Sequence, residues 1–152
     1  MSRQVLSDQV LSRPAVQAYL RLLRGHKALT RELSARLLAD HGLTLNDYEV
    51  LAHLSRAPEC RLRRVDLVDR LFLTPSGITR LLDGLECAGY VAKDTCETDA
   101  RVTYAVLTDA GHEKLREASA SHLADIQRAF GDLAPAELET LSELLRRLSE
   151  PD

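Results

Sequence analysis

The chain has 152 residues and 45% of them are hydrophobic, which is enough for the core of one domain of ordinary size and excludes wholesale disorder. No apolar run approaches the roughly 20 residues that a membrane helix needs. The first residues, MSRQVLSDQVLSRP, are too polar for a signal peptide, so we expect a cytoplasmic protein that does not bind a membrane.

Charge is unevenly distributed along the chain, although the net charge is only −3. Residues 56–81 carry 6 basic and 3 acidic side chains, whereas residues 82–101 carry 2 basic and 5 acidic ones. Residues 102–152 carry 5 basic and 10 acidic side chains. The basic excess therefore ends near Arg80, and this asymmetry permits an anion-binding surface on an acidic protein.

Two helices are predicted first. A long helix covers roughly residues 14–40, because leucines recur at helical spacing and Gly42 follows as a stop. Thr44 caps a second helix, with Asp47 three residues later in a capping-box arrangement, and Pro58 closes it. Both helices have an apolar face that must be buried against another element.

Two shorter helices follow. The third covers about residues 63–71, and a tight turn at 72–74 joins it to the fourth. Its inward residues are Val65, Val68 and Leu71. Thr74 is the N-cap of the fourth helix, Pro75 its first residue and Gly89 its stop. Its apolar stripe consists of Ile78, Leu81, Leu82 and Leu85.

The period then changes from helical to alternating. The segment RVTYAVLT, residues 101–108, is typical of a strand, and residues 90–93 would pair with it across a polar loop at 94–100. Two further helices are predicted, from Thr108 to about Phe130 and then to the C-terminus. The fold class is therefore mainly α with a small β-hairpin, and a tight helix pair followed by a wing indicates a winged helix-turn-helix.

The outer face of the fourth helix carries the candidate binding residues. Ser76, Thr79 and Arg80 lie in its first half, which enters the major groove in helix-turn-helix proteins. Arginine can bind guanine, and hydroxyls can bind base edges or phosphates. Gly77 would let the backbone approach DNA closely. The alternative is that this face is only a solvated helix surface, and Asp83, one turn further along, counts against DNA contact.

At this point the chain resembles the MarR family of bacterial transcription regulators over about residues 14–149. The segment DARVTYAVLTDAG is similar to the family's wing signature, LTPSGITRLLDGLECAGYV to its recognition helix, and LTLNDYEVLAHL to its second helix. The resemblance implies one domain over residues 1–152. Its DNA-binding part would cover residues 43–108, and its dimerisation helices residues 5–40 and 109–150.

The resemblance also implies a homodimer that binds a palindromic operator in double-stranded DNA, most simply as a repressor. The recognition helices would enter successive major grooves, and Arg101, held by Asp99, would enter the flanking minor groove. The implied DNA-contacting set is Arg63, Arg64, Thr74, Ser76, Gly77, Thr79, Arg80, Lys93, Asp99 and Arg101.

The wing departs from the family pattern of adjacent arginines. Lys93-Asp94 and Ala100-Arg101 stand at those two places, and the loop between them is acidic. Fewer phosphate contacts weaken binding and flatten its salt dependence, so we predict a weaker or more sequence-restricted wing contact. The cluster Arg61, Arg63 and Arg64 would compensate, or it is only a solvated face.

Cysteines and histidines leave further hypotheses open. Acidic neighbours should raise the pKa of Cys96, the helix dipole disfavours a thiolate at Cys87, and arginines surround Cys60. We interpret all three as structural thiols, with a redox-responsive repressor as an alternative. No local spacing indicates a metal site, and no cofactor is predicted.

An effector and two other function classes complete the interpretation. The resemblance implies a crevice for a small phenolic or aromatic acid, which His26, Tyr48 and His53 would line; the alternative is that these three are only core and surface residues. The acidic wing motivates an alternative, a winged-helix protein with weak DNA binding that acts through protein contacts. An enzyme is not expected, because no nucleophile–base arrangement, phosphate loop or paired carboxylates stand out.

Overall fold

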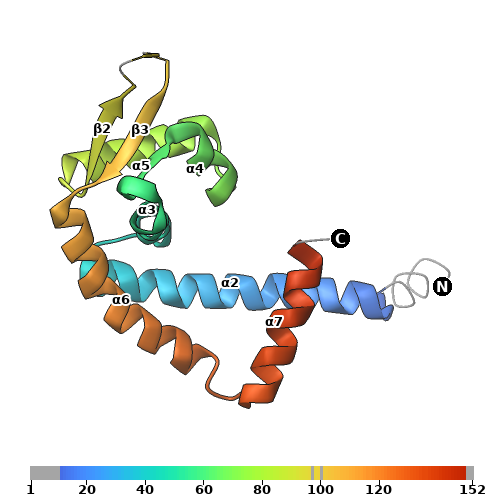
Figure 1. The fold of residues 1–152 in the computed structure, drawn as a ribbon. Coiled ribbons are helices and arrows are strands. Elements are labelled where there is room, and N and C mark those ends of the chain that lie inside the picture. Colours follow the sequence, from blue (N-terminus) through green and yellow to red (C-terminus); the bar gives the residue numbers. More distant parts are fainter. Residues whose placement is uncertain (1–10, 97, 100, 150–152) are drawn as a thin grey trace.

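The computed structural model describes residues 11–96, 98–99 and 101–149, and it is mainly helical with one small sheet (Figure 1). The elements are α2 (Pro14–His41), α3 (Leu45–Arg56), the 3₁₀ turn η1 (Pro58–Cys60), β1 (Arg61–Arg63), α4 (Arg64–Leu71), α5 (Pro75–Cys87), β2 (Val91–Thr95), β3 (Thr103–Leu107), α6 (Asp109–Ala129) and α7 (Pro135–Ser149). Within the described ranges no helix combines the length and the hydropathy that crossing a bilayer requires.

The predicted helix ends are confirmed by their hydrogen bonds. Thr44 and Asp47 form the reciprocal capping box at the start of α3, with nitrogen–oxygen distances of 2.8 and 3.1 Å. Thr74 Oγ1 accepts from the Gly77 N–H at 3.1 Å at the start of α5. Gly42 ends α2 with a φ of 67°, which a residue with a side chain adopts only at a cost. These local signals place the helices correctly.

The winged unit, which we define as residues 43–108, has a closed hydrophobic core. Helices α3, α4 and α5 pack around it, and the sheet lies against them. Its most deeply buried side chains are Val50, Leu51, Leu54, Leu67, Ile78 and Leu82, each at most 2% exposed. Apolar residues three or four apart on each helix meet in this core.

The sheet differs from the predicted hairpin because it has a third strand. Strand β1 pairs antiparallel with β3, so the order is β1-β3-β2. Ala105 and Leu107 of β3 face the core, and Leu62 of β1 joins them. A three-residue strand is too short to show an alternating pattern, and its partner is more than forty positions away. The sequence therefore could not indicate it.

One of the three residues predicted for the inward face of α4 is wrong: Leu71 is buried and Val68 packs against the core, but Val65 does not. Val65 is 62% exposed, whereas Leu67 is fully buried. Arg63 is the N-cap of α4 rather than its first residue. Choosing positions 65, 68 and 71 assumed a strict spacing of three residues. The α-helix needs 3.6 residues per turn, so the buried stripe follows Leu67 and Leu71.

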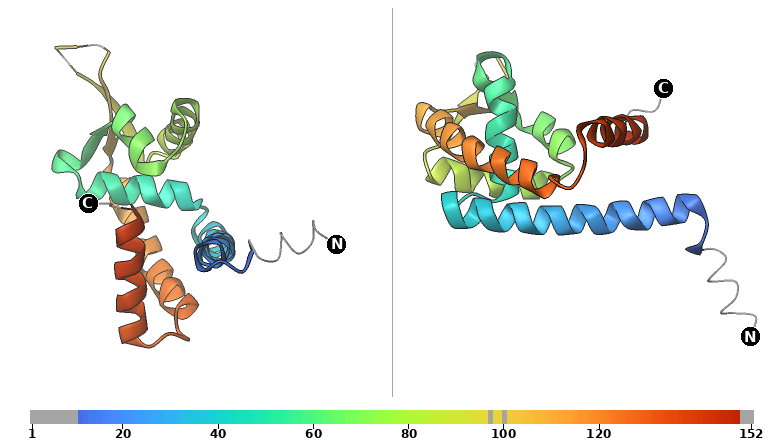
Figure 2. Two further views of the ribbon diagram at one scale, coloured as in Figure 1. Left: turned by 90° about the vertical axis from the view of Figure 1, so that its right-hand side faces the viewer. Right: turned by 90° about the horizontal axis from the view of Figure 1, so that it is seen from below.

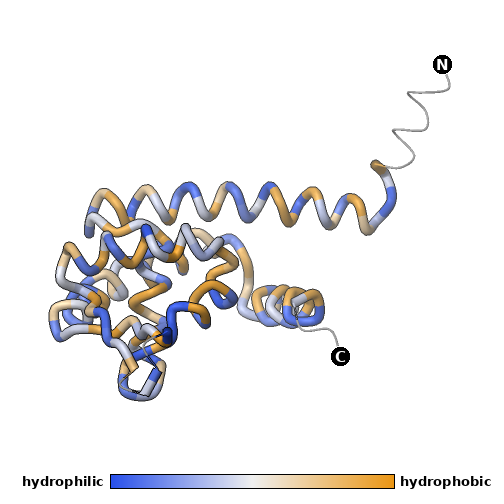
Figure 3. Tube along the Cα trace, turned by 90° about the horizontal axis from the view of Figure 1, so that it is seen from above, coloured by the Kyte–Doolittle hydropathy of each residue, from blue (hydrophilic) through white to orange (hydrophobic). Residues whose placement is uncertain are grey.

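Helices α2, α6 and α7 extend away from the winged unit. Figure 2 shows α7 standing clear of α2, and Figure 3 shows apolar positions recurring along both projecting helices. Leu141 is only half-buried, and Leu145 and Leu148 are exposed to 38% and 71%. Their helical register was predicted, but within one chain nothing described covers them. We call α7 and the first half of α2 (residues 14–27) the arms.

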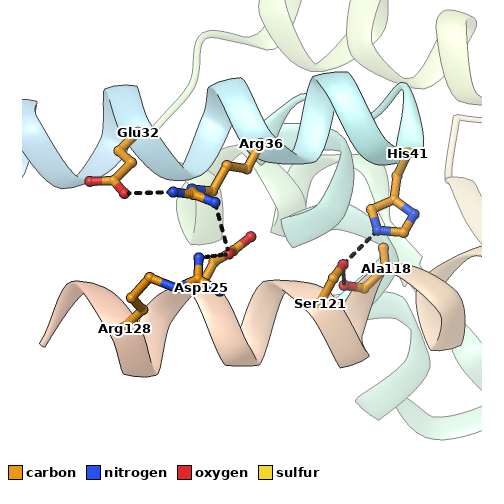
Figure 4. A network of polar contacts seen from close by, with 7 residues as sticks. All are labelled: Glu32, Arg36, His41, Ala118, Ser121, Asp125 and Arg128. Atoms are coloured by element: carbon orange, nitrogen blue, oxygen red, sulfur yellow. Dashed lines mark hydrogen bonds and ion pairs between the residues drawn. The ribbon is translucent and has the colours of Figure 1, made fainter. Parts of the chain in front are cut away.

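A polar seam joins α2 to α6 where both approach the winged unit (Figure 4). Asp125 accepts from Arg128 at 2.7 Å and lies 3.5 Å from the Arg36 guanidinium. His41 Nε2 lies 2.6 Å from the Ser121 hydroxyl. Asp125 is only 9% exposed, so the two arginines neutralise a carboxylate that burial would otherwise penalise. The seam fixes the direction in which α2 leaves the winged unit.

Candidate nucleic-acid interface

Helix α5 presents a polar face opposite its buried stripe. Ile78 and Leu82 hold the helix in the core, whereas Ser76, Thr79 and Arg80 are exposed. This is the geometry that the sequence predicted. A helix that is anchored on one face and polar on the other can enter a groove of DNA without losing its packing.

The exposed polar residues of α5 differ in how many of their hydrogen-bonding groups are already used within the chain. Thr79 Oγ1 donates to the Pro75 carbonyl at 3.0 Å, and Ser76 Oγ lies 3.2 Å from Thr74 Oγ1. Both hydroxyls can still accept a hydrogen bond from a ligand. No residue in the described ranges pairs with the Arg80 guanidinium, so its donors face solvent. Arg80 is therefore the strongest candidate for a base contact.

Gly77 has a structural reason to lack a side chain. A Cβ built at this position would lie 3.2 Å from the Thr74 hydroxyl, which is the N-cap of α5. Glycine therefore leaves room for the cap as well as for any ligand. The expected backbone approach to DNA at Gly77 stays a prediction.

Of the three clustered arginines, Arg61 and Arg63 precede α4 and are engaged in exposed ion pairs. Arg63 binds the Asp66 carboxylate with two bonds of 2.7 and 2.9 Å, and this bonding lowers the pKa of Asp66. Arg61 pairs with Glu59 at 2.6 Å and Asp94 at 3.4 Å, and its guanidinium lies 4.9 Å from the centre of the Tyr104 ring.

These pairs bear on the compensation expected from the basic cluster. The sequence predicted that Arg61 and Arg63 would either contact phosphate or be solvated. In the structure their charges are balanced by neighbouring carboxylates, so phosphate would have to compete for them. Exposed pairs of this kind are worth about 0–1 kcal/mol, so DNA could displace them. Their role in DNA binding stays a prediction.

Arg64 is placed differently, because its side chain is half-buried between α4 and α5. Its Nη2 lies 3.4 Å from Glu86 and 3.7 Å from Asp83, both on α5. Arg64 Nε is buried and has no hydrogen-bond partner among the described residues. The predicted DNA contact of Arg64 is untested, but its guanidinium points to α5 rather than outward.

The wing carries its cations at the surface. Lys93 is exposed in β2, and Arg101 is exposed in the turn before β3. Asp99 Oδ1 accepts from the backbone N–H of Arg101 at 2.9 Å, so this carboxylate orders the backbone of Arg101. The resemblance implied that Asp99 holds Arg101, and the contact observed runs through the peptide. Glu97 and Ala100, which contribute to the predicted acidic loop and its departure from the family pattern, lie outside the described residues.

The expectation for the Cys96 thiol is wrong in direction. Hydrogen bonds from the Thr98 hydroxyl and from the backbone N–H groups of Thr98 and Asp99 lower its pKa. The nearby Asp99 charge acts in the opposite direction and is the smaller effect. Direct donors outweigh a neighbouring charge because they bind the thiolate itself. Sequence proximity alone does not show where these donors point.

Cys60 has a neighbour that the sequence does not indicate. Its Sγ lies 3.4 Å from Nε2 of His112, in the first turn of α6. Cys60 and the preceding Glu59 both have positive φ values, of 52° and 54°. In the described ranges no group of three possible ligands gathers around a metal position.

The residues predicted for an effector are only partly brought together. Tyr48 and His53 line a cavity of about 370 Å³ between α3 and the end of α4. Its remaining lining is Glu49, Ala52, Arg56, Arg70, Leu71 and Phe72. Burial, and secondarily the charge of Arg70, lower the pKa of His53. His26 is exposed on α2 and does not line this cavity.

Two buried polar residues of α6 were missed from the sequence. His122 and Asp125 are 5% and 9% exposed, and the Tyr48 ring meets His122 edge-on with centroids 4.6 Å apart. The pKa of His122 is lowered by burial, and Asp125 opposes this effect. Ala118, His122 and Asp125 are spaced so that they lie on one face of α6, and this spacing could have indicated that the two polar residues are buried.

Comparison with known proteins identifies relatives of the whole chain. A profile described as MarR family matches residues 41–102. The chain is 32% identical to YkoM, an uncharacterized HTH-type transcriptional regulator of Bacillus subtilis, over 97% of this chain and 93% of that protein.

Solved structures agree. AbsC, a MarR family transcriptional regulator from Streptomyces coelicolor, is similar with a TM-score of 0.80 and 34% identity, over 91% of this chain and 94% of that chain. Sco3205, a MarR family regulator from the same organism solved in complex with DNA, is similar with a TM-score of 0.82 and 29% identity, over 88% of this chain and 84% of that chain.

Proposed function

Because the chain belongs to the MarR family of transcriptional regulators, we propose that it is a homodimeric repressor that binds a palindromic operator through α5 and the wing. The observation that carries this proposal is the exposed face of α5, where Ser76, Thr79 and Arg80 stand opposite the buried Ile78, Leu82 and Leu85, and no described residue pairs with the Arg80 guanidinium. Family membership also makes the chain a regulator rather than an enzyme.

The site residues have distinct roles in this proposal. Arg80 reads a guanine through its fork of donors, and Ser76 and Thr79 contact bases or phosphates beside it. Thr74 and Gly77 bring the positive end of α5 toward a phosphate. Arg101 enters the flanking minor groove, with its backbone ordered by Asp99, and Lys93 contacts the phosphates beside it.

The arms support a dimer. Exposed leucines on α7 and apolar residues on the first half of α2, such as Tyr19 at 60% exposure, form surfaces that water disfavours. A second copy would cover them, and two-fold symmetry would then place two α5 helices against the two halves of a palindrome. The predicted dimerisation segments 5–40 and 109–150 include residues 5–10 and 150, which lie outside the described residues.

We assign a small aromatic or phenolic acid as the effector, bound in the cavity that Tyr48 and His53 line. The aromatic rings of Tyr48 and Phe72 offer stacking surfaces, and Arg56 and Arg70 offer partners for a carboxylate. The cavity adjoins the turn between α4 and α5. Binding there would bias the position of α5 and so relieve repression.

The decisive experiment selects operators from a random duplex library with the full chain and measures affinity by fluorescence anisotropy. We expect an inverted repeat to be enriched. Arg80→Ala should weaken the binding free energy for this repeat by about 1–3 kcal/mol and relax specificity at one base per half-site. Arg101→Ala should weaken binding through the flanking bases. Arg116→Ala, which removes an equal charge on α6, is the control and should have no effect.

Selection without any enriched sequence, together with equal affinity for every duplex, would contradict this proposal. That result would favour the alternative in which the winged unit acts through protein contacts. The acidic side chains around the wing, among them Asp94, motivated that alternative.

A redox-responsive repressor is a second candidate, and the contact between Cys60 and His112 favours it. The His112 ring nitrogen lies within hydrogen-bond distance of the Cys60 sulfur and can hold it in place. Peroxide would then oxidise Cys60 to a sulfenic acid with release of water. Operator release by peroxide that survives Cys60→Ser would exclude Cys60 as the sensor, and Cys96→Ser and Cys87→Ser serve as matched controls.

A further inference from the structure

The recognition helix carries acidic residues that DNA should repel. Asp83 and Glu86 lie one and two turns beyond Thr79 on α5, and Arg80 is the only cation of that helix. Unbalanced carboxylates near phosphates cost binding energy because like charges repel. The charge that balances them comes from the neighbouring helix, from Arg64.

The placement of Arg64 separates it from the other arginines before α4. Its side chain is 23% exposed, against 39% for Arg61 and 52% for Arg63. Its nearer partner Glu86 is 27% exposed, whereas Asp83 is 64% exposed. Water screens the contact with Glu86 less than it screens the exposed pairs of Arg61 and Arg63.

The contact crosses between the two helices of the helix-turn-helix. Arg64 is the first residue of α4, and Glu86 is in the last turn of α5. The short turn at 72–74 ties the other ends of these helices together. Burial of Leu67 and Leu82 in the shared apolar core holds the two helices together, but apolar contacts are not directional. A hydrogen-bonded ion pair is directional, so it restrains the rotation of α5 about its own axis.

We propose that Arg64 is a positioning residue that sets the angle of α5 in the major groove through Glu86, and that it does not itself contact DNA. The inference rests on the proposed function, because it assumes that α5 reads bases. Arg64 neutralises the carboxylates near the C-terminal end of α5 and orients the guanidinium of Arg80. A small rotation of α5 would displace Arg80 from its base while leaving phosphate contacts elsewhere intact.

Salt dependence distinguishes positioning from phosphate contact. Each phosphate that a protein neutralises contributes about −0.9 to the slope of log affinity against log salt concentration. If Arg64 contacted phosphate in both subunits, removing it would flatten the slope by about 2 and weaken all duplexes equally. A positioning residue leaves the slope unchanged and lowers only the preference for the selected operator.

The experiment measures affinity for the selected operator and for a scrambled duplex between 50 and 200 mM KCl. It compares the wild-type chain with Arg64→Met, Glu86→Gln and the double variant. We expect each single change to reduce the operator-to-scrambled ratio by about tenfold, the loss expected for one misplaced base contact. The double variant should lose no more than either single one, because both act through the same contact. Arg64→Lys should restore part of the ratio.

Three results would overturn the inference: a flatter slope in Arg64→Met, an unchanged ratio in Glu86→Gln, or additive losses in the double variant. If Arg64→Met does not fold by circular dichroism, Glu86→Gln decides alone, because it removes the same contact from the more exposed side. Failure of the wild-type chain to prefer any operator would instead contradict the proposed function, so the two failures are distinguishable.

Discussion

The winged unit and the arms use apolar residues in opposite ways. In the winged unit the leucines of α3, α4 and α5 are buried within one chain, and Leu51, Leu54, Leu67 and Leu82 are fully covered. In the arms, leucines at equally regular helical spacing stay exposed, with Leu144, Leu145 and Leu148 between 38% and 71%. The same periodicity therefore has two structural outcomes.

This difference shows that a helical pattern specifies a face but not the surface that covers it. The core of the winged unit is completed within one chain by Leu37 of α2 and Ala118 of α6, so its stability should not depend on protein concentration. The arms need a second surface, so their contribution should depend on concentration. Four predictions test this contrast, from the largest expected effect to the smallest.

Gly111→Ala should cause the largest loss. A Cβ there would lie 2.1 Å from the Tyr90 carbonyl oxygen and 2.6 Å from Leu107 Cδ1, so α6 must shift away from the sheet. We expect a loss of about 3 kcal/mol in the free energy of unfolding, measured by urea titration. Gly84→Ala is the control, because nothing lies within 4 Å of a Cβ built at this position. Replacing a glycine inside α5 should raise the free energy of unfolding by about 1 kcal/mol. Equal effects would show that the unit is not closely packed at this junction.

Leu145→Ser should weaken the dimer by about 1–2 kcal/mol, roughly tenfold in dissociation constant, because it places a hydroxyl in the surface that a second copy covers. Sedimentation equilibrium across concentrations measures the change. Val65→Ser removes an apolar side chain of the winged unit that is more exposed, 62% against 38% for Leu145, and should leave association unchanged. If both variants behave alike, the arms are not the dimer surface.

Phe72→Gly should stabilise the winged unit by about 1 kcal/mol, because its φ of 52° is strained for a bulky residue. The ring is 95% exposed, so little packing is lost. Phe72→Ala removes the ring but keeps the backbone strain. Its melting temperature in thermal unfolding should therefore be lower than that of Phe72→Gly. The reverse order would mean that the ring makes a contact in solution that outweighs the strain.

Acidification should destabilise the fold through His122, where α6 packs against Tyr48 of the winged unit. Burial lowers the pKa of His122 below 6.5, with Asp125 opposing it, so the unfolded chain takes up a proton first. This contribution is complete above pH 6.5 and is lost as the pH falls toward the folded pKa. His122→Gln should flatten the dependence of unfolding free energy on pH between 7 and 5. His26→Gln, at an exposed site, is the control, and an identical profile in both would exclude His122.

Much of the fold could be predicted because its signals are local. Capping hydroxyls at Thr44 and Thr74, the glycine at position 42 and the alternation of β3 each act within a few residues, so the chain order of helices and strands follows from them. The exposed face of α5 also follows, since helix geometry alone places Ser76, Thr79 and Arg80 opposite Ile78.

The sequence by itself thus determined the order of the helices and of the two hairpin strands, the fold class and the face of α5 that is free to bind. Only the tertiary structure decided which charges that face keeps. Strand β1 needs a distant partner, and the engagement of Arg64 with Glu86 depends on how α4 crosses α5. Burial of His122 depends on the packing of α6 against α3. Ion pairs and burial join residues far apart in the chain, and a local pattern contains no information about which of those residues meet.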